Sequence, residues 1–144
     1  VRAADFTGGG IIDLFIGGRS IPFAYGENPR SYLLKNDGSG KFQDITEQFS
    51  PDLVNIGLVK NAEVLDCDGD RDQDLILSLE WDGVCLMENE KGKFTKKMLT
   101  KATGWWNFTL TNDFDLDGDL DILVGNLGLN SRIKTSHEHP VRLY

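Results

Sequence analysis

Aspartate occupies every second position of the stretch DCDGDRDQDL, which spans residues 66–75. The stretch DFDLDGDLDI, residues 113–122, repeats the pattern 47 positions later, with aspartate again at positions 1, 3, 5, 7 and 9. Five carboxylates this close together repel one another in any compact conformation unless a cation neutralises them. The candidate metal ligands are therefore these ten side chains: Asp66, Asp68, Asp70, Asp72, Asp74, Asp113, Asp115, Asp117, Asp119 and Asp121.

Calcium is the cation that fits such a loop best. It takes about 6 to 8 oxygen ligands in a flexible geometry, whereas magnesium prefers fewer protein oxygens in a stricter octahedron. Zinc or copper would require histidine or cysteine. We therefore predict two Ca²⁺ sites, one in each loop. The side chains at positions 1, 3 and 5 should converge on the ion, position 7 should offer its backbone carbonyl, and position 9 should close the shell.

The loops differ from an EF-hand, although the spacing of their first aspartates is similar. Leu77 and Val124 stand where an EF-hand has its glutamate, and a strand rather than a helix is expected to follow each loop. Gly118 occupies position 6 of the second loop, where a sharp turn needs glycine, but Arg71 occupies that position in the first loop. We therefore expect the two sites to differ in geometry.

A third, incomplete copy of the loop, DFTGGGIIDL, spans residues 5–14. Asp5 and Asp13 keep positions 1 and 9, while Thr7 and Gly9 replace the carboxylates of positions 3 and 5. The glycines can let this turn keep its shape without an ion. We therefore expect no third calcium site at Asp5 and Asp13.

Short aliphatic or alternating runs flank the two complete loops and predict strands. A second repeated element, seen at residues 32–42 and 85–94, predicts a strand, a glycine-containing hairpin turn and another strand. Together these signals predict four strands between about residues 58 and 99. No stretch has the long 3.6-residue period of an amphipathic helix, so the chain is expected to be all-β.

Units of four strands that recur every 40 to 60 residues are typical of propeller blades. We predict a β-propeller segment of four-stranded antiparallel blades with Asp-rich calcium loops. Residues 1–52 would form the blade with the incomplete loop, 53–101 a complete blade, and 102–144 the start of further blades. Residues 19–30 and 47–56 are expected to be blade-edge loops. Residues 141–144 resemble a strand entering another loop, so we expect a fragment of a longer protein.

The acidity of the chain is local. Its 15 basic and 23 acidic residues give a net charge of −8, but outside the two loops 13 acidic residues face 15 basic ones. No basic stripe is present to neutralise phosphates, which excludes nucleic acid as a partner. No apolar run approaches the roughly 18 residues of a transmembrane segment. Cys67 and Cys85 are predicted to be small buried hydrophobes, although a disulfide stays open for an exported protein.

Three further features were weighed as functional candidates. The stretch Gly104-Trp105-Trp106-Asn107-Phe108 could pack between blades or offer a stacking surface for a sugar or peptide. Trp81, at a hairpin turn, is expected to be partly exposed. His137 and His139 would point to opposite faces of an extended strand, so we expect no metal there. The sequence contains no nucleophile elbow, P-loop or dinucleotide motif, and we expect no catalytic residues in it.

The loops, each lying between two predicted strands, resemble the FG-GAP/VCBS repeat family. That family includes the calcium-bearing blades of integrin α-subunit propellers and many bacterial secreted or surface proteins. The chain as a whole resembles bacterial VCBS-repeat proteins that are often joined to ASPIC/UnbV domains. The segments that carry this resemblance are 13–19, 32–38, 104–107 and 125–130.

The resemblance implies calcium-binding propeller repeats of an exported or cell-surface protein, with neighbouring blades in a longer parent chain. Weak calcium sites are filled at the roughly millimolar concentrations found outside cells, which also favours export. We expect such repeats to bind a protein or glycan partner that the sequence does not identify. The alternatives are part of a polysaccharide-active, lyase-like propeller enzyme or a purely architectural spacer.

Overall fold

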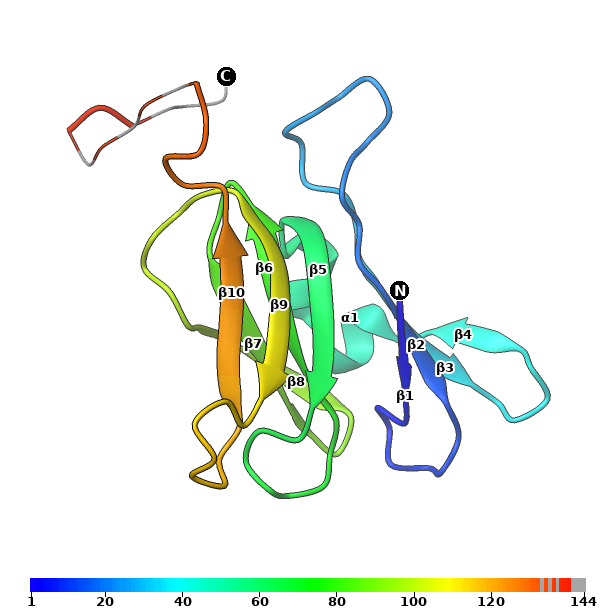
Figure 1. Cartoon of the computed structure of the whole chain (residues 1–144). Coiled ribbons are helices and arrows are strands. Elements are labelled where there is room, and N and C mark those ends of the chain that lie inside the picture. Colours follow the sequence, from blue (N-terminus) through cyan, green and yellow to red (C-terminus); the bar gives the residue numbers. More distant parts are fainter. Residues whose placement is uncertain (133, 135, 137, 141–144) are drawn as a thin grey trace.

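The computed structural model describes residues 1–132, 134, 136 and 138–140 (Figure 1). The strand predicted at residues 141–144 and the side chain of His137 lie outside the described residues. Antiparallel strands dominate the described part of the chain, which confirms the all-β prediction. No helix in that part is long and apolar enough to cross a membrane.

Two four-stranded antiparallel sheets follow one another along the chain, and in each the strand order is the chain order. The first sheet contains β1 (Arg2–Ala4), β2 (Asp13–Ile16), β3 (Tyr32–Asn36) and β4 (Phe42–Asp44). The second contains β5 (Leu58–Leu65), β6 (Asp74–Glu80), β7 (Val84–Glu90) and β8 (Lys93–Met98). The four strands predicted between about residues 58 and 99 are therefore confirmed.

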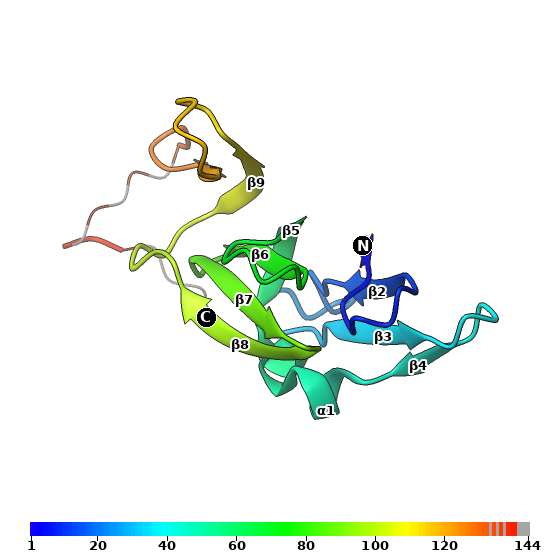
Figure 2. The same ribbon diagram turned by 90° about the horizontal axis from the view of Figure 1, so that it is seen from below.

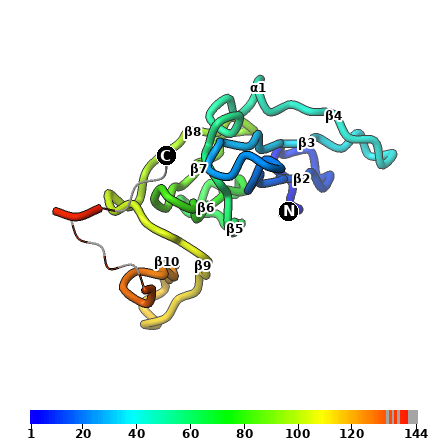
Figure 3. The backbone as a smooth tube through the Cα atoms, turned by 90° about the horizontal axis from the view of Figure 1, so that it is seen from above, coloured from blue at the N-terminus to red at the C-terminus, as the bar shows by residue number. Residues whose placement is uncertain are grey.

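A two-stranded antiparallel sheet follows, made of β9 (Trp106–Asn112) and β10 (Asp121–Asn126). Strand β5 packs against both β1 and β9, so the first strands of the three sheets lie next to one another. Views along the strands from either end show that the later strands of the two four-stranded sheets extend away from the row formed by these first strands (Figures 2 and 3). This arrangement is consistent with propeller-like blades.

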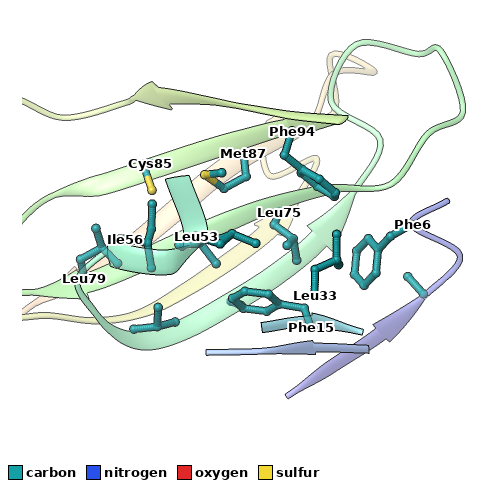
Figure 4. Packing of buried hydrophobic residues seen from close by; sticks show 14 of the residues in the cluster. Phe6, Phe15, Leu33, Leu53, Ile56, Leu75, Leu79, Cys85, Met87 and Phe94 are labelled. Carbon is teal, nitrogen blue, oxygen red and sulfur yellow. The ribbon is translucent and has the colours of Figure 1, made fainter. Parts of the chain in front are cut away.

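The main core lies between the first two sheets (Figure 4). Phe6, Phe15 and Leu33 come from the first sheet and its loop, and they face side chains such as Leu75 and Met87 of the second. Successive side chains of a strand point to opposite faces, so β6 serves two cores at once. The other face of β6 contributes to a smaller cluster, against which Trp106 of β9 and Val124 of β10 pack. Every residue of β6 is therefore buried.

The prediction of a loop at residues 47–56 was wrong. The segment contains helix α1 (Thr46–Phe49) and the 3₁₀ helix η1 (Pro51–Asn55), which starts with proline, a favourable first residue. Helix η1 and the residue after it place Leu53 and Ile56 in the main core. Burial of these side chains stabilises η1, which is too short to show a helical period in the sequence.

The two cysteines are free thiols with different surroundings. Cys85 is buried as predicted, but the prediction was wrong for Cys67, which is exposed because it stands at position 2 of the first Asp loop. Burial raises the pKa of Cys85 to about 12. Partial desolvation of the Cys67 thiol, together with the adjacent Asp74 carboxylate, raises the pKa of that group to about 12 as well. Both thiols therefore stay protonated at neutral pH.

Candidate functional site

The three Asp loops lie at the same end of their sheets (Figure 1) and share one backbone conformation. Position 6 has a positive φ in each, at Gly10 (73°), Arg71 (78°) and Gly118 (98°). The amide of that residue donates a hydrogen bond to the position-1 carboxylate, at 2.6 Å to Asp5, 3.0 Å to Asp66 and 3.0 Å to Asp113. Arg71 therefore adopts the same left-handed turn as the glycines, at the steric cost of a side chain in that region.

The second complete loop gathers Asp113, Asp115 and Asp117, each of which offers an oxygen within 4.8 Å of the others. The Oδ1 atom of Asp113 is buried and makes no hydrogen bond within the described residues. A buried polar atom without a partner is rare and costly in a folded protein. The donor set, made only of carboxylate oxygens, fits a hard divalent cation such as calcium.

The first complete loop gathers Asp66, Asp68 and Asp74 in the same way. Electrostatic repulsion inside this loop is visible at Asp70. A hydrogen bond from the Asp72 amide lowers the pKa of Asp70, but some loss of hydration and the charges of Asp68, Asp72 and Asp66 together raise it above its ordinary value. A bound cation would relieve this repulsion.

The other predicted ligands lie outside these two groups. Asp70 accepts a hydrogen bond from the Asp72 amide at 2.7 Å, and Asp72 accepts one from the Lys91 amide at 2.6 Å. Asp121 accepts a hydrogen bond from the Phe114 amide at 3.0 Å, while Asp119 is exposed. The prediction that these four residues also contribute to the calcium shells, through other oxygens or through water, stays a prediction.

The aspartate at position 9 also connects its loop to the sheet. Asp74 is fully buried and accepts hydrogen bonds from the amides of Cys67 at 2.8 Å and Asn89 at 2.7 Å. Asp13 does the same with the amides of Thr7 at 3.1 Å and Asn36 at 2.9 Å. The sequence reasoning did not identify this role, although Asn36, the last residue of β3, and Asn89, the penultimate residue of β7, are both part of the second repeat.

Asn89 extends this connection from one sheet to the next. Its Nδ2 donates hydrogen bonds to the carbonyls of Gln73 at 3.1 Å and of Phe6, in the incomplete loop, at 3.0 Å. Its Oδ1 accepts a hydrogen bond from the Gly92 amide at 2.7 Å. One buried amide thus links the first complete loop, the hairpin turn at Gly92 and the incomplete loop of the first sheet.

The incomplete loop satisfies its own carboxylates. The Thr7 hydroxyl donates to Asp13 at 3.0 Å, and Asp5 accepts hydrogen bonds from the amides of Gly9 and Gly10. Thr7 and Gly9 stand where the complete loops carry aspartates at positions 3 and 5, so this loop offers an ion fewer anionic oxygens than they do. This gives a physical reason for the prediction that this loop holds no calcium.

A second cluster lies at the opposite end of the sheets and is centred on Glu80, the last residue of β6. This carboxylate is 2% exposed and accepts hydrogen bonds from the Tyr25 hydroxyl, from Arg19 Nε at 3.3 Å and from Lys60 Nζ at 3.2 Å. Lys60 lies at a β-bulge of β5, between Val59 and Asn61. Bulges change the direction of a side chain, and here the ammonium reaches Glu80.

Aromatic rings surround this carboxylate. The Trp81 indole donates a hydrogen bond to the Tyr25 hydroxyl at 2.8 Å, and its ring lies 5.3 Å from that of Trp105 at an interplanar angle of 35°. Trp105 also forms an isolated β-bridge with Glu80. Trp106, by contrast, packs against the smaller core, as expected for packing between sheets.

The sequence reasoning identified Trp81 and Trp105 but not Arg19, Tyr25, Lys60 or Glu80. Tyr25 and Arg19 are 55 and 61 positions from Glu80, and both belong to the segment that was interpreted as a blade-edge loop. No motif links these residues. Only the packing of the first sheet against the second brings them together.

Replacing Glu80 with glutamine should destabilise the chain in a pH-dependent way. Burial alone raises the pKa of Glu80, but hydrogen bonds from Tyr25 and Trp105 and the charge of Lys60 outweigh burial and lower it from 4.5 to about 2. A carboxyl group whose pKa is lowered by folding stabilises the folded state at every pH above its unfolded-state pKa. For Glu80 this contribution is about 3 kcal/mol. It is complete above pH 4.5 and is lost as the pH falls to about 2.

Urea unfolding of wild type and E80Q between pH 7 and pH 2 would measure this difference. The matched control is Glu63→Gln, because Glu63 forms a more exposed ion pair with Arg2 and should contribute under about 1 kcal/mol. A stability difference between wild type and E80Q that does not change with pH would contradict the prediction.

Comparison with known families gives one match. Residues 66–124, which contain both complete Asp loops, match the model of the FG-GAP-like repeat. The resemblance to repeats of the FG-GAP/VCBS type is confirmed over this segment, which is less than half of the chain. A search of the curated proteins found no match.

Proposed function

We propose, from the FG-GAP-like repeat that residues 66–124 form, that this chain is a calcium-stabilised segment of a β-propeller. Each complete Asp loop holds one Ca²⁺, through Asp66, Asp68 and Asp74 in one loop and through Asp113, Asp115 and Asp117 in the other. The remaining aspartates of each loop complete the shell directly or through water.

The observation that carries this proposal is the buried Oδ1 of Asp113, which has no hydrogen-bond partner in the described residues and lies in a group of three converging carboxylates. A cation supplies the missing partner and cancels the repulsion in the loop. The role of the ion is structural. It fixes the turn between two strands, and its binding free energy adds to the stability of the fold.

The repeats belong, in this proposal, to an exported or cell-surface protein, where calcium is abundant enough to fill the sites. They bind a protein or glycan partner and perform no catalysis. Tyr25 is the one phenol that donates a hydrogen bond to a buried carboxylate in the described residues, but partial desolvation and its contact with Glu80 raise its pKa. A raised pKa disfavours a general base, which argues against the lyase-like alternative.

Calorimetric titration of the chain with calcium would test the proposal, with two ions expected per chain. The double variant D113N/D115N should bind one ion, because it removes two ligands of one loop and leaves the other intact. Asp5→Asn is the matched control and should keep two, since Asp5 accepts only backbone amides. A folded wild-type chain that binds no calcium would overturn the proposal.

A further inference from the structure

We propose that six residues at the end opposite the Asp loops form a binding site for an acidic saccharide. We name this group the Glu80 cluster, and it consists of Arg19, Tyr25, Lys60, Glu80, Trp81 and Trp105. The inference rests on the proposed binding role of the chain, and it identifies the site and the class of ligand. It does not depend on the calcium sites, because the two sets of residues share no member.

The cluster is held in place before any ligand arrives. The Trp81 indole donates to Tyr25, Tyr25 donates to Glu80, and Trp81 stacks at a tilt on Trp105. Trp81 has a φ of 72°, an uncommon backbone conformation for a bulky residue, and the β-bulge at Lys60 interrupts the register of β5. Strained residues and bulges concentrate at functional sites, and a rigid site loses little entropy on binding.

The charges of the cluster favour an anion. Arg19 and Lys60 carry two positive charges against the single negative charge of buried Glu80. Arg19 contacts Glu80 only through Nε, and its side chain is 56% exposed. Its terminal nitrogens make no hydrogen bond within the described residues. A guanidinium fork that is anchored at one nitrogen and open at the others suits a carboxylate.

The rings favour a sugar over a peptide. Tyr25 is 50% and Trp105 is 36% exposed, and Tyr25 donates a hydrogen bond to the same Glu80 carboxylate that Arg19 contacts. The C–H face of a pyranose ring packs on such surfaces, because aromatic side chains combine an apolar face with a polar edge. An extended peptide more often pairs with a strand edge or fills alternating pockets.

Calorimetry with three probes would test this inference in calcium buffer: a hyaluronan hexasaccharide, neutral maltohexaose and hexaglutamate. Binding is expected for the hyaluronan hexasaccharide alone. Arg19→Gln should weaken it by about tenfold or more, since a charge-assisted hydrogen bond to the carboxylate is lost. Trp105→Ala should weaken it similarly through the lost stacking surface.

The matched control is Arg30→Gln, which removes the same charge from a residue that pairs with Asp44 and Glu47 instead. It should leave binding within about twofold of wild type, as expected for a charge outside the site. Equal effects of R19Q and R30Q would overturn the inference, and so would binding of hexaglutamate alone or of no probe. The calcium stoichiometry of R19Q should stay at two, so a failure here is distinguishable from a failure of the calcium proposal.

Discussion

Removal of calcium with EDTA is expected to lower the melting temperature of the chain by about 10 to 20 °C relative to about 10 mM calcium. A ligand present at about 100 times its Kd stabilises the folded state by about 2.7 kcal/mol per site, and two sites are proposed. This concentration corresponds to a Kd near 10⁻⁴ M, in the range of extracellular calcium modules. Circular dichroism during heating would measure the shift.

Magnesium at the same concentration is the control for this melt. It should give a much smaller shift, because the loops offer flexible carboxylates rather than a strict octahedron. An equal shift with magnesium would indicate general screening of the loop charges. A folded chain with the same melting temperature in EDTA and in calcium would contradict the prediction and leave the acidic loops as a surface for a cationic partner.

Replacing Asp74 with alanine is expected to destabilise the chain by about 3 to 5 kcal/mol even in EDTA. Asp74 is fully buried, and its loss leaves the amides of Cys67 and Asn89 without their acceptor. Each unsatisfied buried donor costs about 1 to 3 kcal/mol. In the presence of calcium the loss should be larger, because Asp74 belongs to the Asp66 group of converging carboxylates.

Asp13→Ala is the matched control, since Asp13 makes the equivalent hydrogen bonds in the loop without a predicted ion. In EDTA the two variants should lose similar stability by urea unfolding. Only D74A should also lose one calcium by titration. If D74A kept two ions, Asp74 would serve the sheet alone, and the ligand set of the first loop would need revision.

The repeated loops could be predicted from the sequence because their chemistry is local. Five alternating aspartates and the flanking aliphatic runs all lie within about 20 residues, so spacing alone specifies strand, loop and strand. The repeat also predicted the four strands of the second sheet. Local signals were insufficient at residues 46–55, where burial of Leu53 rather than helical periodicity stabilises the short helices.

The Glu80 cluster could not be predicted, for the opposite reason. Its members come from a loop of the first sheet, a bulge in β5, the end of β6 and the segment before β9. Trp81 and Trp105 stand out in the sequence as aromatic residues, but nothing in the sequence links them to the other four members. From the sequence, a glutamate at the end of an aliphatic strand is expected to be exposed to solvent. In the fold, the loop that contains Arg19 and Tyr25 covers Glu80.

The hydrogen bond from Asn89 to the Phe6 carbonyl can form only after most of the second sheet has been synthesised, long after the first strands of the chain. The two residues are 83 positions apart, and ribosomes add about 5 to 20 residues per second. The first sheet therefore waits about 4 to 17 seconds for the side chain that fixes its loop. Over that interval the face carrying Phe6, Phe15 and Leu33 lacks its complete partner sheet. A nascent chain of this architecture thus gains from chaperone protection until its second sheet has emerged.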